Sequence, residues 1–422
     1  MIHQIKSEEM SIFLQSSILS PGDTLLLETG AVYESIYLKN LTDVLITAEG
    51  EGAVIQGGSE HGIVAENCQN LLIENIKARG IDRKYHNKQG VGFLFRGGGE
   101  ITAKHCEAFG FQRSGFEACG VRQLHFEDLS AHDNGYSGIH VTRGDDGSWS
   151  QDVVMTRCSA VNNPGDPKVT SNHSGNGIVL YYTKDALVEY CDASYNGWDM
   201  DNSAFNGPVG IWCANCLRAV FRYCLSHDNR TQWGKTDGGG FDFDGGTKDS
   251  LMEYCYSYNN SGSGYMFCQY ANAAELSGNT IRYCASFNDG TAYHKSALYL
   301  FDCGSASMAA GGQFYRNLLY NSAGRDIVRG HIDDTFIHDN IMLLKGDGKF
   351  FNHEFDDSGL LHRGPERQVW GKVTFEDNCL VKLEDGNQAD EITKLADYRH
   401  ILNATELPDY FSGLSMETRS IL

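Results

Sequence analysis

A small apolar residue recurs about every 30 residues along most of this 422-residue chain, and this repeat constrains the fold more than any other feature. Representative units read IENIKA (73–78), VEYCDA (188–193), FRYCLS (221–226) and MEYCYS (252–257). One column of the aligned repeats consists of Ile76, Cys106, Leu129, Cys158, Cys191, Cys224, Cys255, Cys284, Leu318, Ile341 and Cys379. Because a unit this short cannot bury its own apolar face, successive units must stack on one another.

A second column follows the first a few residues later and is made of amide or acid side chains: Asn134, Asn163, Asn196, Asn229, Asn260 and Asp289. Between the columns, apolar and polar residues alternate over short stretches bounded by Gly or Asn, which predicts short strands joined by bends. The pattern therefore predicts an all-β, right-handed parallel β-helix of about eleven coils. In this fold the Cys column is an internal stack, and the Asn column is a ladder of amides at left-handed bends.

The two ends of the chain differ from the repeats. Residues 7–17 space their apolar side chains as a helix does, and we expect an N-terminal cap over 1–20. Residues 391–402 also have helical spacing, which predicts a C-terminal cap and tail over 385–422. Such caps cover sheet edges that otherwise favour aggregation. We therefore expect one domain over 1–422.

Composition limits the partners and the compartment. The formal charge of −21 gives no basic footprint for nucleic acid or for an anionic membrane. No stretch approaches the roughly 18 apolar residues of a membrane span. The first ten residues lack the order of a signal peptide, so we expect a cytoplasmic protein, or a secreted one if a leader was removed. The sequence carries no signal for the oligomeric state.

The 13 cysteines are explained mainly by the repeat, which contains seven of them. Identical side chains stacked along parallel strands do not point at one another, so we expect no disulfides in the column. Cys213 and Cys216 form a CxxC pair without a second pair, which is a weak signal for a metal site.

A strand that begins with Gly follows each Asn bend, as in Gly138–Thr142 and Gly240–Asp244. The second and fourth positions of these strands are apolar and are expected to point into the coil, so the third and fifth positions face outward. The outward row consists of Glu117, His140, Thr142, Tyr181, Trp212, Asp242, Asp244, Met266 and Tyr299. Aromatic rings beside acids and imidazoles indicate a carbohydrate-binding groove, and ordinary surface polarity is the alternative.

Three successive coils carry long insertions just before these strands, at 164–176, 197–209 and 230–239. Long loops on one side of a rigid scaffold are usually functional. These loops are predicted to wall the groove with His173, Trp198, Asp199, Asp201, Trp233, Lys235 and Asp237.

The densest acidic stretch is Asp237–Asp244, in which Asp242 and Asp244 share one strand face. Two positions along a strand are about 6.5–7 Å apart at the backbone. This spacing is in or near the roughly 6.5–9.5 Å of inverting glycosidases, whereas retaining ones have about 5–5.5 Å. Mutual repulsion is expected to raise the pKa of one partner toward that of a general acid. The alternatives are a calcium site made of Asp237, Asp242 and Asp244, or a solvated Gly-rich turn.

The repeat pattern and the opening Leu19-Ser-Pro-Gly-Asp23 resemble the pectate-lyase-like superfamily of right-handed β-helix proteins. Asp237–Asp244 resembles the Asp-Gly-Phe-Asp motif of its calcium-dependent lyases, which implies Ca²⁺ on the aspartates and a Lys base in the next coil. This chain has Met266 at the base position, and a thioether cannot abstract a proton. A lyase mechanism would need Lys235, His173 or His140 instead.

We therefore predict a glycoside hydrolase that needs no cofactor and acts on a poly- or oligosaccharide. Asp242 and Asp244 would be acid and base, or nucleophile, assisted by Asp237, Asp201 or Asp199. Its predicted substrate contacts are Trp212, Tyr181, Trp198 and Trp233 for sugar rings and His140, His173, Glu117 and Lys235 for polar groups. A calcium-dependent polysaccharide lyase and a non-catalytic carbohydrate-binding β-helix are the alternatives, because fold alone does not imply activity.

Overall fold

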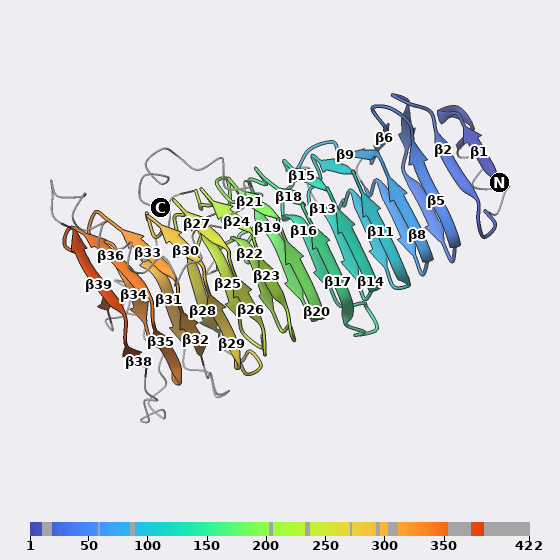
Figure 1. Cartoon of the computed structure of the whole chain (residues 1–422). Coiled ribbons are helices and arrows are strands. Elements are labelled where there is room, and N and C mark those ends of the chain that lie inside the picture. Colours follow the sequence, from blue (N-terminus) through green and yellow to red (C-terminus); the bar gives the residue numbers. More distant parts are fainter. Residues whose placement is uncertain are drawn as a thin grey trace.

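Each turn of the chain adds one strand to each of three parallel sheets, and the stacked turns form an elongated β-helix (Figure 1). The computed structural model describes residues 1–10, 19–57, 60–84, 89–201, 206–232, 237–270, 272–292, 296–302, 311–352 and 373–383. Successive coils pair in register, so each residue lies beside its counterpart in the next coil, about 4.8 Å away. All the strand pairs in these ranges are parallel, as predicted from the repeat.

Sheet A has 14 strands, and its order follows the chain. They are β1 (Ile2–Ile5), β2 (Thr24–Leu27), β5 (Thr42–Ala48), β8 (Gln69–Glu74), β11 (Gly99–Lys104), β14 (Arg122–Glu127), β17 (Ser150–Thr156), β20 (Thr183–Glu189), β23 (Val220–Arg222), β26 (Leu251–Glu253), β29 (Asn279–Arg282), β32 (Gly312–Tyr315), β35 (Thr335–His338) and β38 (Thr374–Glu376).

Sheet B has 13 strands and follows sheet A in each coil. They are β3 (Val32–Glu34), β6 (Ala53–Gln56), β9 (Ile76–Arg79), β12 (Glu107–Phe109), β15 (Ser130–His132), β18 (Ser159–Ala160), β21 (Asp192–Ser194), β24 (Leu225–His227), β27 (Tyr256–Tyr258), β30 (Ala285–Phe287), β33 (Leu318–Asn321), β36 (Ile341–Lys345) and β39 (Cys379–Leu383).

Sheet C completes each coil with 12 strands and carries the acidic stretch. They are β4 (Ile36–Lys39), β7 (Ile63–Glu66), β10 (Phe93–Arg96), β13 (Ser114–Cys119), β16 (Ser137–Thr142), β19 (Asn176–Tyr181), β22 (Val209–Ala214), β25 (Gly239–Asp244), β28 (Tyr265–Gln269), β31 (Ser296–Asp302), β34 (Asp326–Gly330) and β37 (Phe351–Asn352).

These sheets contain more strands than the eleven aligned repeats, because the first coils lack the Cys and Asn signature.

Within the described ranges, helical conformation near the N-terminus is limited to the short 3-10 turn η1 (Ser7–Glu9) and Met10, so the predicted N-terminal helix is not supported there. The remainder of that expected helix, 11–17, and the expected C-terminal helix and tail from 385 onward lie outside the described residues. Within the described part of the chain, no helix has the length and apolarity needed to cross a membrane.

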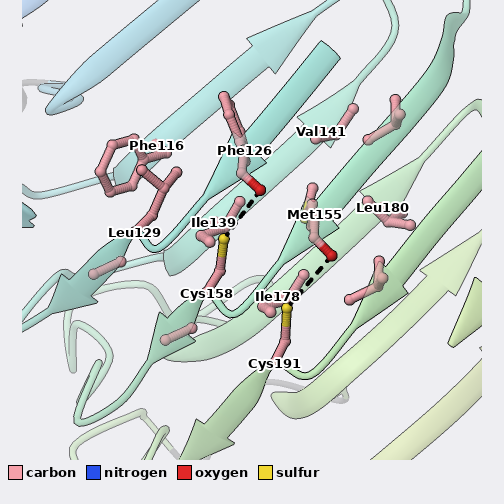
Figure 2. Packing of buried hydrophobic residues seen from close by; sticks show 14 of the residues in the cluster. Phe116, Phe126, Leu129, Ile139, Val141, Met155, Cys158, Ile178, Leu180 and Cys191 are labelled. Carbon is pink, nitrogen blue, oxygen red and sulfur yellow. Dashed lines mark hydrogen bonds between the residues drawn. The ribbon is translucent and has the colours of Figure 1, made fainter. Parts of the chain in front are cut away.

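The Cys column is an internal stack, as the repeat predicts. Figure 2 shows Cys158 and Cys191 beneath one another in the core, each thiol directed at the carbonyl of an earlier strand. Cys106, Cys224, Cys255 and Cys284 are also buried in this core. All twelve described cysteines are free thiols, and Cys303 lies outside the described residues.

The last three members of the predicted column were assigned wrongly. Leu318 pairs with Ala285, one residue after Cys284, so it faces outward from sheet B together with Ile341 and Cys379. The internal positions are taken by asparagines instead: the amide of Asn317 donates to Asn340, which in turn donates to Asn378. The column therefore contains six cysteines, and a polar residue is tolerated inside because its hydrogen bonds are satisfied by the next coil.

The predicted Asn ladder is confirmed. The side-chain amides of Asn134, Asn163, Asn196 and Asn229 each donate to the next ladder residue over 2.9–3.0 Å, and Asn260 closes the ladder by donating to Asp289. The left-handed backbone conformation belongs to the residue that precedes each ladder position, for example Asn162 and Asp228. The ladder fixes the bend that leads from sheet B into the long loops and sheet C.

Candidate active site

Asp242 and Asp244 both lie on the outer face of β25. Phe241 and Phe243, which alternate with them, are fully buried in the internal core. The alternation predicted from the sequence therefore places both carboxylates outside the coil. They are not on an open surface, however, because Asp242 is only 4% exposed and Asp244 is half-buried.

The two carboxylates lie closer together than their backbone spacing suggests. One oxygen of each, together with the sulfur of Cys268, lie within 4.8 Å of one another. Cys268 is the register partner of Asp244 in the next strand, β28. This separation is nearer to the roughly 5–5.5 Å typical of retaining glycosidases than to the inverting range.

Asp237 adds a third negative group from the loop that leads into β25. Its carboxylate accepts a hydrogen bond of 2.7 Å from the backbone N–H of Gly207, at the end of the preceding long loop. Burial raises the pKa of Asp237 to about 6. This hydrogen bond joins the described ends of two of the long loops.

The surroundings of the three acids favour their protonated form and raise their pKa values. Burial raises the pKa of Asp242 well above its usual value, and repulsion by Asp244 and Asp237 raises it further. Burial raises the pKa of Asp244 to about 7, although hydrogen bonds from Gly245 N–H and the Cys268 thiol lower it in part. No described Lys, Arg or His forms an ion pair with Asp242 or Asp244. Carboxyl groups that titrate near neutrality are suited to exchange protons with a substrate.

An aromatic cluster lies beside the acids on the preceding coils. Trp212 is the register partner of Asp242, and its ring meets Tyr181 at 5.2 Å and His173 at 5.1 Å between centroids. The indole N–H donates to Asn176. Trp212 is only 4% exposed, whereas Tyr181 is half-buried. Tyr181 is therefore the more exposed of these two rings, and it packs edge-on against Trp212.

His173 is held as a neutral imidazole. Burial, together with the repulsion from His140, lowers its pKa to about 4. Its Nδ1 lies 2.8 Å from the amide nitrogen of Asn176, which also binds Trp212. The predicted contact residue His173 thus positions the aromatic cluster.

Glu117 and His140 lie farther along the same outward column of sheet C. Glu117 accepts hydrogen bonds from Arg113 (2.6 Å) and Ser114, and its oxygen is 3.7 Å from Nδ1 of His140. Burial alone would raise the pKa of Glu117, but His140 and Arg113 outweigh it and hold that pKa below its usual range. This group is an ion-pair network separate from the three aspartates, in which Glu117 has its partners while, among the described residues, neither ring nitrogen of the buried His140 makes a hydrogen bond.

Two predicted site residues lie elsewhere. The indole N–H of Trp198 donates to Asn162, and Asp199 forms ion pairs with Arg83 and Lys84. These contacts tie the 197–201 segment to an earlier loop and account for both side chains structurally. Asp201 follows on this segment and is half-buried. Trp233 and Lys235 lie outside the described residues.

The sequence reasoning overlooked Cys268 and Tyr270. Cys268 occupies the fifth, outward position of its strand, so the same alignment that selected Asp244 contains it. Tyr270 is 37% exposed, and its hydroxyl meets the amide of Asn215 beside Gly245. No sequence pattern marks Tyr270, because it lies in a turn after the strand.

The donor set does not fit the calcium site that the lyase resemblance implies. Ca²⁺ takes six to eight oxygen ligands. The ligand atoms brought together within the described ranges are two carboxylate oxygens and one thiol sulfur, which is a poor donor for a hard cation. Met266 is the register partner of Asp242, so the expected base position of such a lyase is a thioether here.

Comparison with known proteins defines the class to which this fold belongs. Residues 34–197, 92–247 and 166–341 match the family described as the right-handed β-helix region, and the chain belongs to that family. The handedness predicted from the repeat is that of the family.

Individual relatives are distant. A lacto-N-biosidase of Bifidobacterium longum subsp. longum is 23% identical over 304 residues, which are 67% of this chain but only 18% of that protein. The crystal structure of the GH136 lacto-N-biosidase from Eubacterium ramulus aligns with a TM-score of 0.55 and 16% identity, over 90% of this chain and 68% of that one. The catalytic domain of a GH87 α-1,3-glucanase in complex with nigerose aligns with a TM-score of 0.60 and 11% identity, over 88% of this chain and 66% of that one. At these identities the structural likeness establishes the fold.

Proposed function

We propose that this protein is a glycoside hydrolase that cleaves a poly- or oligosaccharide on the outer face of sheet C. The observation that carries the proposal is the close set of three carboxyl groups, Asp237, Asp242 and Asp244, beside an aromatic cluster. The similarity to a lacto-N-biosidase and to an α-1,3-glucanase supports the same class of reaction.

The catalytic role of each carboxyl group depends on whether it is protonated. Because like charges in a buried site cannot all ionise, at least one of the three keeps its proton near neutral pH and can protonate the leaving oxygen as the general acid. An ionised partner then acts as nucleophile or as the base that activates water. The oxygens of Asp242 and Asp244 lie within 4.8 Å, which favours a retaining reaction through a covalent intermediate.

Tyr181 is half-buried and Tyr270 is 37% exposed, and both rings lie close enough to Asp244 for its charge to raise their pKa. Aromatic faces bind the apolar faces of sugar rings. We assign these two rings to sugar units next to the cleaved bond, in place of Trp198, which is occupied by its own contacts.

The test is a screen of the purified protein on neutral and acidic polysaccharides, each with and without EDTA. Hydrolysis releases reducing sugar without ultraviolet absorbance and should persist in EDTA, because no calcium is required. Release of an unsaturated, absorbing product that stops in EDTA would show a calcium-dependent lyase instead. Binding without any product would show a non-catalytic protein.

A further inference from the structure

An exposed aromatic platform lies at the corner between sheets C and A, on the coils that precede the carboxyl groups. It consists of Trp149, Tyr182 and Arg143. Trp149 is 38% exposed, its ring meets the edge of Tyr182 at 5.7 Å between centroids, and the guanidinium of Arg143 lies 4.1 Å over the Tyr182 ring. None of these three residues belongs to the carboxyl cluster or to the contacts assigned above.

The platform is continuous with the candidate active site. Tyr182 meets Tyr181 at 6.5 Å between centroids, and Tyr181 meets Trp212, the register partner of Asp242. Tyr181 is two coils from Asp244 and Thr142 is three, since their register partners run from Thr142 through Tyr181 and Ala214 to Asp244. At about 4.8 Å per coil, the platform begins about 10–14 Å from Asp244 along the helix axis.

The counterparts of Tyr182 in three nearby coils have no aromatic ring. Backbone hydrogen bonds place Gly97, Gly120 and Asn215 at the position that Tyr182 occupies. Tyr182 therefore adds a bulky side chain at the one corner where the loop with Trp149 projects.

The loop that presents Trp149 is built to hold its shape. Gly144 N–H donates to Ser148 C=O over 2.8 Å, and Asp146 accepts from both the backbone N–H and the hydroxyl of Ser148. Ser150 follows Trp149, and its hydroxyl donates to the carbonyl of Thr142, which closes the loop at its base. A preformed ring of this kind binds a ligand without an entropic cost for ordering the loop.

We propose that Trp149, Tyr182 and Arg143 form a distal sugar-binding subsite, so that the substrate is an oligo- or polysaccharide longer than a disaccharide. The inference rests on the proposed function, because it takes the bond cleaved at Asp244 as its reference point. The indole face of Trp149 stacks on a sugar ring. The guanidinium of Arg143, which has donors beyond its contact with Tyr182, donates to that ring's hydroxyl groups.

The first experiment measures binding independently of turnover. Fluorescently labelled Asp244→Asn protein is applied to a microarray of di- to hexasaccharides, and the same protein carrying Trp149→Ala is applied in parallel. The matched control is Trp198→Ala, which removes a tryptophan of nearly equal exposure (37%), also contacted by an arginine, Arg83, from another corner. We expect Trp149→Ala to weaken binding of the longer glycans about tenfold and to leave disaccharide binding unchanged, and Trp198→Ala to change neither.

The second experiment uses active protein and the glycans that bind. Trp149→Ala should raise KM for the long substrate and leave kcat/KM for the shortest cleaved substrate unchanged. Three results would overturn the subsite. Trp149→Ala could reduce activity equally on short and long substrates, or it could have no effect. The Asp244→Asn protein could also bind no glycan of the array. A change in sedimentation with Trp149→Ala at unaltered affinity would also overturn the subsite and would assign the platform to a second copy of the chain. Binding that depends on Trp149 in a protein that hydrolyses nothing would contradict the hydrolase while leaving the subsite in place.

Discussion

Glu117 and Asp242 are two buried carboxylates of the same outward column of sheet C, four coils apart, and they have opposite electrostatics. Both are at most 5% exposed. Glu117 has Arg113 and His140 as partners, and its pKa is lowered. Asp242 faces two further aspartates, and its pKa is raised. Among the described residues, the carboxylate of Glu117 is paired with cationic partners, whereas no described Lys, Arg or His forms an ion pair with Asp242.

The largest expected effect is the loss of turnover on neutralising the acids. Asp244→Asn or Asp242→Asn should lower kcat by about 10³-fold or more, because each removes a group that gives or accepts a proton or attacks the sugar. The measurement is the initial rate of reducing-sugar release.

The matched control for this loss is Asp289→Asn. Asp289 is also buried with its pKa raised by burial to about 6, but it ends the internal Asn ladder. Asparagine continues that ladder, so this variant should retain activity. If Asp244→Asn and Asp242→Asn both keep normal rates, the acidic strand is structural.

The second effect is on stability. Below about pH 4, Asp244 is protonated in both the folded and the unfolded chain. Its raised pKa therefore does not lower the free energy of unfolding in that range. As the pH rises from about 4 to 7, the unfolded chain loses this proton while the folded chain keeps it, so stability falls by up to about 4 kcal/mol. Asp244→Asn lacks this penalty and should raise Tm at pH 8 but not at pH 4. If the Tm of Asp244→Asn at pH 8 is equal to or lower than that of the unmodified protein, ionisation of Asp244 does not destabilise the fold.

Glu117→Gln should have the opposite effect. It leaves the guanidinium of Arg113 without its carboxylate and should cost about 2–3 kcal/mol, less than a fully buried pair because Arg113 is 30% exposed. Thermal unfolding at pH 7 measures this loss. A Tm that rises in Glu117→Gln, as in Asp244→Asn, would erase the distinction between the two carboxylates.

The smallest effect concerns Cys268, whose thiol donates to Asp244 and lowers its pKa in part. Cys268→Ala removes this donor, so the pKa of Asp244 should rise and the corresponding limb of the pH profile of kcat/KM should move to higher pH by a fraction of a unit. Cys268→Ser keeps a donor and should restore the profile. A shift of the same size in Cys268→Ser would assign the effect to packing.

The fold could be predicted from the sequence because the same pattern of apolar, amide and glycine residues recurs in successive coils of a solenoid. The Asn ladder and the alternation around Phe241 and Phe243 followed directly from this repetition. The prediction went wrong at Leu318, Ile341 and Cys379, where an apolar neighbour was aligned in place of an asparagine of the internal column. Sequence alone does not show that Asn317 finds its partners in Asn340 and a backbone carbonyl.

The candidate site was predictable only in part. Strand alternation identified Asp242 and Asp244, since their direction is a local property of β25. Their close approach, their burial and the pairing of Asp199 with Arg83 depend on loops that pack from distant coils. Trp149 and Tyr270 lie in turns, where no periodicity reports the direction of a side chain.

The most direct test of the hydrolase is the fate of water during turnover. The protein is incubated with a cleaved oligosaccharide in H₂¹⁸O, and the products are analysed by mass spectrometry. Hydrolysis by Asp237, Asp242 and Asp244 predicts ¹⁸O at the anomeric carbon of the newly formed reducing end, with no incorporation by Asp244→Asn beyond spontaneous exchange. Products without ¹⁸O that carry an unsaturated sugar would contradict the account.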